Sequence, residues 1–260
     1  FEMGSIPSKE TVLKASPTSD QPQAPFAPAP IEQVVATIKA EKPAMVFAPH
    51  VETASGIILP DDYLKQVADA VHSVGGLFVL DCIASGTIWV DMKAIGVDVL
   101  ISAPQKGWSS SPCSALVMLS EAADQRLHET TSTSFACDLR KWRDIMIAYE
   151  NGGHAYHATM PTDALRGFRD TMLETMKEGL TAVKERQWKL GSAVRELMAK
   201  HGFASVAAPG FEAPGVVVSY TDASLTLGSI YIPQAMLIAA VIAVAVMGGL
   251  YLLLNHPWAG

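Results

Sequence analysis

The chain has 260 residues, of which 49% are hydrophobic, and its formal net charge at pH 7 is −7. This apolar content is sufficient for a folded core in one or two domains, while an acidic balance without a basic run argues against nucleic acid and anionic membrane surfaces as partners. Three cysteines without a CxxC pair and seven histidines without an HExxH motif predict neither a disulfide framework nor a metal site, so small molecules are the expected ligands.

The composition and the hydrophobic periodicity of the sequence change at residue 31. Residues 1–30 are rich in proline, serine and glutamine and have no helical period, so we expect an extended connector there. From Ile31 apolar residues recur at helical spacing, and the apolar stretch "AMVFAP" follows. The segment "LPDDYLKQVADAVHSVGG" predicts a second helix, because its leucine and valines form one stripe and a glycine pair ends it.

Three further apolar segments follow along the chain: "LFVLD", "VDVLISA" and "SALVMLS". Short strands that are nearly all apolar and alternate with helices are typical of the α/β class, with a mostly parallel sheet covered by helices on both faces. Such sheets bind ligands at the carboxyl ends of their strands. The residues that follow each strand are therefore the first candidates for a site.

Polar side chains stand at three of these strand ends. His50 and Thr53 follow the first strand, Asp81 closes the second, and Gln105 and Lys106 follow the third. An acid at one strand end and a lysine just past another suit a pyridoxal phosphate enzyme, in which the lysine forms a Schiff base and the carboxylate keeps the pyridine nitrogen protonated. The spacing alone also allows a helix-capping acid and a solvated lysine.

The segments "HVETASGIILP", "FVLDCIASG" and "VDVLISAPQKGW", in this order, resemble the class V aminotransferases, and most closely the alanine/serine–glyoxylate aminotransferase group. The resemblance implies the large domain of the type I pyridoxal phosphate transferase fold over about 31–222. By position it implies that Lys106 is the Schiff-base lysine and that Asp81 is the partner of the pyridinium nitrogen. Thr53 and Gln105 would lie beside the ring and the phosphate of the cofactor.

The segment "YHATMP" resembles a family segment that reaches across a subunit interface. The resemblance therefore implies a homodimer in which Tyr156 and Thr159 lie at the phosphate of the neighbouring subunit. Two interpretations of His50 stay open, a cofactor contact and a structural hydrogen bond. Pro104 stands where the family often has a small hydroxyl residue, so one polar contact of the family is not expected here.

Long helices are predicted after Pro161, over 162–178 and about 181–200. The segment "GVVVSYTD" then resembles the first strand of a smaller C-terminal domain. From residue 223 to residue 260 the chain has no charged side chain, and a helix over about 230–254 would be long enough to cross a bilayer core of ~30 Å. The alternative interpretation of this segment is a buried hairpin.

The resemblance implies a transaminase that moves an amino group from alanine, serine or aspartate to glyoxylate or pyruvate. In the family, a phosphate loop and a ring-stacking aromatic precede the region that this sequence matches, and an arginine that binds the substrate carboxylate follows it. None of the three is present here, so weak or absent activity is expected for the chain alone. The alternative is a membrane-tethered, non-catalytic protein that keeps the fold. The catalytic part is expected to face the cytoplasm, with membrane association through residues 230–254. A desulfurase is less favoured, because no glycine- and serine-rich loop carries a cysteine.

Overall fold

A computed structural model describes residues 11–221, and its centre is a four-stranded mixed sheet with the strand order β3-β6-β7-β8. The strands β3 (Met45–Pro49), β6 (Leu77–Asp81) and β7 (Val99–Ser102) are parallel, as predicted. The last strand, β8 (Leu116–Leu119), is antiparallel to β7. No helix lies between β7 and β8, and a direct connection without a crossover favours the antiparallel direction.

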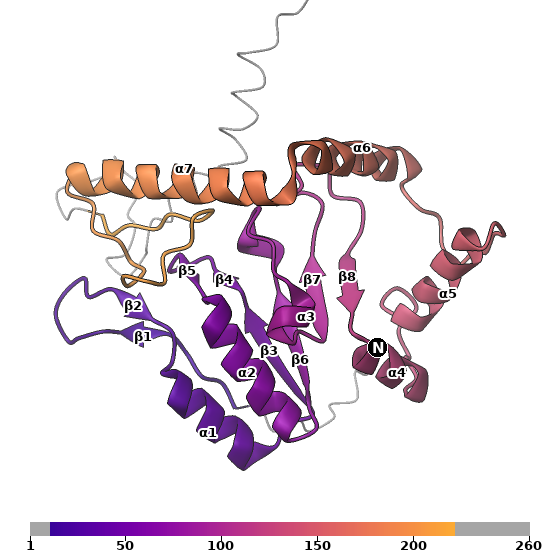
Figure 1. Cartoon of the computed structure of the whole chain (residues 1–260), viewed down its shortest axis with the longest axis horizontal. Coiled ribbons are helices and arrows are strands. Elements are labelled where there is room, and N and C mark those ends of the chain that lie inside the picture. The colour runs from indigo at the N-terminus through magenta and orange to yellow at the C-terminus, as the bar shows by residue number, and fades with distance from the viewer. Residues whose placement is uncertain (1–10, 222–260) are drawn as a thin grey trace, which may run out of the picture.

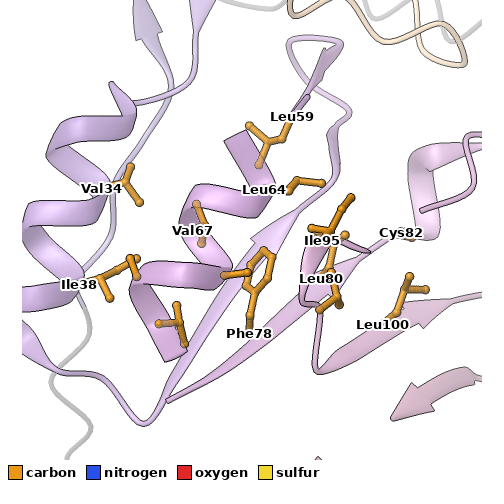
Figure 2. Close-up of a cluster of buried hydrophobic side chains, with 14 of the residues drawn as sticks. Val34, Ile38, Leu59, Leu64, Val67, Phe78, Leu80, Cys82, Ile95 and Leu100 are labelled. Carbon is orange, nitrogen blue, oxygen red and sulfur yellow. The ribbon is translucent and has the colours of Figure 1, made fainter. Parts of the chain in front are cut away.

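One face of this sheet is packed against the helices α1 (Ile31–Glu41), α2 (Asp61–Ser73) and α3 (Met92–Ile95), which surround the main core (Figure 1, Figure 2). Helix α2 forms because its apolar residues recur at positions i, i+3, i+4 and i+7, and all of them are buried: Leu64, Val67, Ala68 and Val71. They pack on Phe78 and Leu80, which are fully buried. Burying a side chain of this size stabilises the fold by ~1.5–3 kcal/mol.

The glycine pair ends α2 where the sequence predicts, for two steric reasons. Gly75 has a φ of 80°, which other residues adopt only with strain. A side chain on Gly76 would place its Cβ 2.5 Å from the carbonyl oxygen of Pro43. The chain can therefore turn directly from α2 into β6.

The opposite face of β3 departs from the expectation of helices on both faces. Val46 and Ala48 point into the main core, whereas the alternate residues Met45 and Phe47 are 44% and 70% exposed. Successive side chains of a strand point to opposite faces, so the exposed pair lies on the face that α1 to α3 leave open. Within residues 11–221, the predicted helical cover of β3 is found on one face only.

A second core lies beside the first and joins the C-terminal described segment to the short strands β4 (Val51–Glu52) and β5 (Ile57–Ile58). Arg195 of α7 (Leu180–Lys200) reaches into it and donates hydrogen bonds to the carbonyl oxygens of Ala213 and Val216, at 2.7 and 3.0 Å. Within its described residues, 215–221, the segment "GVVVSYTD" forms no regular strand. Its pairing is an isolated bridge between Ser205 and Ser219 with neighbouring backbone hydrogen bonds.

The remaining elements lie around these two cores. Within the predicted connector, a small antiparallel pair forms from β1 (Ser16–Pro17) and β2 (Phe26–Ala27). A 3-10 turn, η1 (Ile83–Ser85), follows β6. Figure 1 shows α7 and α6 (Thr162–Glu178) end to end across the side of the sheet where β7 ends, with α4 (Glu121–Glu129) and α5 (Leu139–Glu150) at one flank.

The predicted membrane span at 230–254 lies outside the described residues. Among the helices of residues 11–221, none combines the length and the apolar character that crossing a membrane requires.

Candidate functional site

The carboxyl ends of three parallel strands meet at one edge of the sheet. Pro49 of β3 pairs with Asp81 of β6, and Asp81 pairs with Ile101 of β7. Lys106 lies five residues after Ile101, in the turn that follows β7. The backbone therefore places the acid and the amine at the ends of neighbouring strands, as the sequence predicts.

Asp81 has an exposed carboxylate and accepts two hydrogen bonds, one at the side chain and one at the backbone. Its Oδ1 accepts a hydrogen bond of 2.9 Å from the backbone N–H of Ile83 in η1. Its backbone carbonyl accepts a hydrogen bond of 2.8 Å from the N–H of His50. Among the described residues, Oδ2 has no hydrogen-bond partner, so it is available to a donor from outside the chain.

The turn that carries Lys106 is closed on itself and packed against η1. The carbonyl oxygens of Pro104 and Lys106 each accept a backbone hydrogen bond of 3.0 Å, from Ser110 and Ser109. A Cβ on Gly107 would lie 1.9 Å from the carbonyl oxygen of Gly86, so only glycine fits this contact. Gln105 and Lys106 are exposed at the tip of the turn, whereas Pro104 is buried beneath it.

Trp108 anchors the end of the same turn. Its ring lies 4.6 Å from that of Trp89 and 6.0 Å, edge to face, from that of Phe168 in α6. The indole N–H of Trp89 donates to the carbonyl oxygen of Leu180 at 3.1 Å. The junction of α6 and α7 is thereby attached to the loops that follow β6 and β7.

His50 is buried behind Asp81. Its Nδ1 is 2.7 Å from the hydroxyl of Ser85, and the thiol of Cys82 is 3.9 Å from the same nitrogen. Burial, and secondarily the positive charge of Lys184, lower the pKa of His50 to about 4, so the imidazole is neutral near pH 7. Burial raises the pKa of Cys82 to about 12, so its thiol is protonated. The geometry shows the structural hydrogen bond that was one of the two interpretations of His50.

Thr53 lies in an exposed turn between β4 and β5. Glu52 organises this turn, because its carboxylate accepts hydrogen bonds of 2.8 Å from the backbone N–H groups of both Ala54 and Ser55, and one of 2.5 Å from the Ser55 hydroxyl. Glu52 is one of the polar residues that follow the first apolar strand, and its role in the turn had a signal in the sequence. It directly precedes the small residues "TASG", and a carboxylate there can accept from the N–H groups that follow.

Tyr156 and Thr159 lie together on the connection between α5 and α6. Their hydroxyls are 3.0 Å apart, and the side chain of Tyr156 is 78% exposed. Neither makes a polar contact with Asp81 or Lys106 within residues 11–221. The single chain therefore does not bring these two residues to the strand-end site.

Two hollows of the described surface lie away from this edge. One is between α4 and α5, with Leu127 and Arg140 in its wall, and the other is at the opposite edge of the sheet, with His72, Leu77 and Asp98 in its wall. No cluster of three or more metal-ligating side chains occurs in the part of the chain that the structure describes. The strand-end site presents one exposed carboxylate and one exposed amine.

Three comparisons place these observations among known proteins. The model of the family "Aminotransferase class-V" matches residues 25–220. The chain is similar to an alanine–glyoxylate aminotransferase of Felis catus, with 27% identity over 164 residues, 61% of this chain and 37% of the relative. It is also similar to an L-aspartate–glyoxylate aminotransferase of Paracoccus denitrificans, with 27% identity over 164 residues, 63% of this chain and 40% of the relative.

Solved structures agree in fold. An alanine–glyoxylate aminotransferase from Nostoc sp. superposes with a TM-score of 0.68 at 22% identity, over 75% of this chain and 51% of that one. A ureidoglycine–glyoxylate aminotransferase from Bacillus subtilis gives 0.65 at 24% identity, over 75% and 49%. The chain spans about two-fifths of the length of the curated relatives that it matches.

Proposed function

The chain belongs to the class V aminotransferases, whose cofactor is pyridoxal phosphate, and we propose that it transfers an amino group from a small amino acid to glyoxylate or pyruvate. The proposed donors are alanine, serine or aspartate, since relatives named for alanine and for aspartate match the same region. The observation that carries the proposal is the placement of Asp81 and Lys106 at neighbouring strand ends, with the turn of one packed on the loop of the other.

The residues at this edge fit the cofactor by their chemistry. Lys106 is exposed and its amine has no polar partner among the described residues, so it can attach covalently to the cofactor aldehyde. The free Oδ2 of Asp81 can accept a hydrogen bond from the protonated ring nitrogen. Thr53 and Gln105, both exposed, would supply hydrogen bonds beside the ring and the phosphate.

Each side chain then has a defined task in amino transfer. The cofactor, when bound, supplies an electron sink for the bond that breaks at the Cα of the amino acid. Asp81 would stay ionised and hold the ring nitrogen protonated, because an opposite charge nearby favours the carboxylate form. The Lys106 amine would remove the Cα proton of the donor and deliver a proton to the cofactor carbon that carried the aldehyde.

Tyr156 and Thr159 have a place in this proposal only in a homodimer. Their exposed, mutually hydrogen-bonded hydroxyls would contact the cofactor phosphate of the neighbouring subunit. Without that second subunit, the phosphate would meet few of the N–H groups and positive charges that usually hold it. We therefore expect weak cofactor binding by a monomeric form of the chain.

The alternative is a membrane-tethered, non-catalytic protein, with its folded part facing the cytoplasm and its span at 230–254. Three free cysteines suit the reducing compartment that this orientation requires. The exposed pair of Asp81 and Lys106 favours amino transfer over a purely structural role, because an exposed amine can attach to the cofactor and an exposed acid can pair with its ring nitrogen.

The test is an alanine–glyoxylate transfer assay on the purified chain at saturating pyridoxal phosphate, beside the variants Lys106→Ala and Lys93→Ala. Lys93 is an exposed lysine of α3, far from the strand-end site, and serves as the matched control. We expect slow transfer that is lost in Lys106→Ala and kept in Lys93→Ala. Equal, measurable rates in wild type and Lys106→Ala would contradict the proposed role of Lys106, whereas no transfer in either protein would favour the non-catalytic alternative.

A further inference from the structure

A buried hydrogen bond joins the ends of β3 and β6 directly behind Asp81. It runs between Nδ1 of His50 and the hydroxyl of Ser85, whose residues are 1% and 2% exposed. We propose that His50 and Ser85 act as a positioning pair, which fixes the direction of the Asp81 carboxylate toward the ring nitrogen of the cofactor. This inference rests on the proposed function of Asp81.

The hydrogen bonds around Asp81 form a closed circuit. The backbone N–H of His50 donates to the Asp81 carbonyl oxygen at 2.8 Å, which ties the last residue of β6 to the end of β3. The N–H of Ile83 donates to Oδ1 of Asp81 at 2.9 Å, which ties the carboxylate to η1. Ser85 is the last residue of η1, and its hydroxyl returns to His50.

This circuit makes the carboxylate direction depend on the side-chain bond. The η1 turn holds Oδ1, and a 3.2 Å hydrogen bond from the N–H of Ser85 to the carbonyl oxygen of Cys82 closes the turn. The His50–Ser85 bond is the side-chain contact that anchors the turn to β3. Without it, the side-chain link between His50 and η1 is lost, and we expect the end of η1 to shift and change the direction of the carboxylate.

Among the described residues, the other polar side chain beside both groups is Cys82, whose thiol also contacts the Ser85 hydroxyl. The thiol of Cys82 is 3.9 Å from Nδ1, too far for a strong hydrogen bond, and it stays protonated. Both groups are buried, so removal of one leaves the other without water as a substitute. Removing either group is therefore expected to displace η1.

The experiment compares Ser85→Ala with Ser73→Ala in the cofactor-loaded protein. Ser73 also donates from a partly buried hydroxyl, to the carbonyl oxygen of Ala70 at the end of α2, and serves as the control. The readouts are the dissociation constant of pyridoxal phosphate, the visible absorption of the bound cofactor as a function of pH, and the single-turnover rate with alanine. The absorption reports the protonation of the ring system, which a purely structural loss of stability would not change.

For Ser85→Ala we expect a changed pH profile of the absorption and a single-turnover rate reduced by about tenfold to a hundredfold, since small misplacements of catalytic groups have costs of this order. Ser73→Ala should match wild type. If cofactor attaches to Lys106 in wild type but Ser85→Ala matches Ser73→Ala, the positioning pair is contradicted while the proposed function stands. If cofactor does not attach to Lys106 in wild type, the proposed function fails and the positioning inference fails with it.

A second pair of variants keeps the test decisive if Ser85→Ala does not fold. His50→Asn is smaller than the native residue and keeps a hydrogen-bonding atom near the position of Nδ1, whereas His50→Leu fills the space without one. We expect His50→Asn to retain the wild-type pH profile and His50→Leu to lose it. The same profile in both variants would contradict the proposal.

Discussion

Gly107 lies so close to Gly86 that a Cβ on Gly107 would be 1.9 Å from the Gly86 carbonyl oxygen. Gly86 directly follows η1, and Gly107 directly follows Lys106. The contact therefore sets how far the turn that carries the amine stands from the loop that orients Asp81. Backbone packing, and not an ion pair, holds the two functional groups at the same edge.

The first prediction concerns this contact. Gly107→Ala should displace the Lys106 turn, because the added Cβ would overlap the backbone of Gly86, which cannot move aside by a side-chain rotation. We expect a loss of ~1–3 kcal/mol in the free energy of unfolding and a large loss of cofactor attachment. Chemical denaturation and the absorption of added pyridoxal phosphate measure the two effects.

Gly167→Ala is the matched control, because position 167 lies inside α6 with no atom within 4 Å of the added Cβ. Replacing a helix-interior glycine by alanine should stabilise the chain by ~0.5–1 kcal/mol. A Gly107→Ala protein as stable and as reactive toward the cofactor as Gly167→Ala would show that the contact does not position the turn.

The second prediction separates cofactor binding from proton transfer at Asp81. Asp81→Asn keeps an oxygen that can accept from Ile83, so the loop should hold and the cofactor should still attach to Lys106. The neutral amide no longer stabilises the protonated ring nitrogen, so the single-turnover rate with alanine should fall ~100-fold or more. Asp69→Asn, at an exposed ion pair with Lys65 on α2, is the control. An unchanged rate in Asp81→Asn would remove Asp81 from the mechanism.

The third prediction is a pH dependence of stability that comes from His50. Its pKa is about 4 in the folded chain against 6.5 for the ordinary residue, mainly because of burial. Between these two values the unfolded chain binds the proton and the folded chain does not, so stability rises with pH across this range. The stability associated with the neutral, buried His50 is fully present above pH 6.5 and is lost as the pH falls toward 4.

This contribution amounts to ~3 kcal/mol, since one pKa unit corresponds to ~1.4 kcal/mol. Denaturation of wild type and His50→Asn at pH 7.5 and pH 4.5 isolates it from the titration of other groups. Wild type should lose ~2–3 kcal/mol more than the variant between these pH values. Equal losses in the two proteins would show that His50 can bind a proton in the folded state.

The fourth prediction concerns the opposite edge of the sheet. Asp98 is buried and accepts hydrogen bonds from His72, Ser120 and the backbone N–H of Phe78, at 2.7, 2.9 and 2.8 Å. Asp98→Ala leaves these donors unsatisfied and should lower the free energy of unfolding by ~3 kcal/mol. Because the network lies where β6 and β7 begin, the folded fraction should retain wild-type cofactor absorption. A changed absorption would mean that the two edges are coupled.

The secondary structure and the strand-end residues followed from local patterns. Helix α2 was predictable from its apolar period and from the glycine pair that ends it, since both signals lie within one short stretch of the sequence. Asp81 and Lys106 were predictable because each stands directly at or after an apolar strand. These features depend on the chain near each residue and require no knowledge of its neighbours in space.

The features that escaped prediction depend on distant parts of the chain. The apolar run of β8 does not encode its direction, and the exposed Phe47 follows from which helices lie on its side of the sheet. The contact of Gly107 with Gly86 joins residues from two loops, and the presence of a glycine in the sequence does not indicate which residue it contacts in the fold. The buried bond of His50 to Ser85 is of the same kind, because it appears only when β3 and β6 pair.

Borohydride reduction of the chain with saturating pyridoxal phosphate, followed by mass mapping of its peptides, identifies the lysine to which the cofactor attaches. We expect a reduced cofactor adduct on Lys106 that is absent in Lys106→Ala. An adduct on another lysine, such as Lys184, or no adduct on any lysine would contradict it.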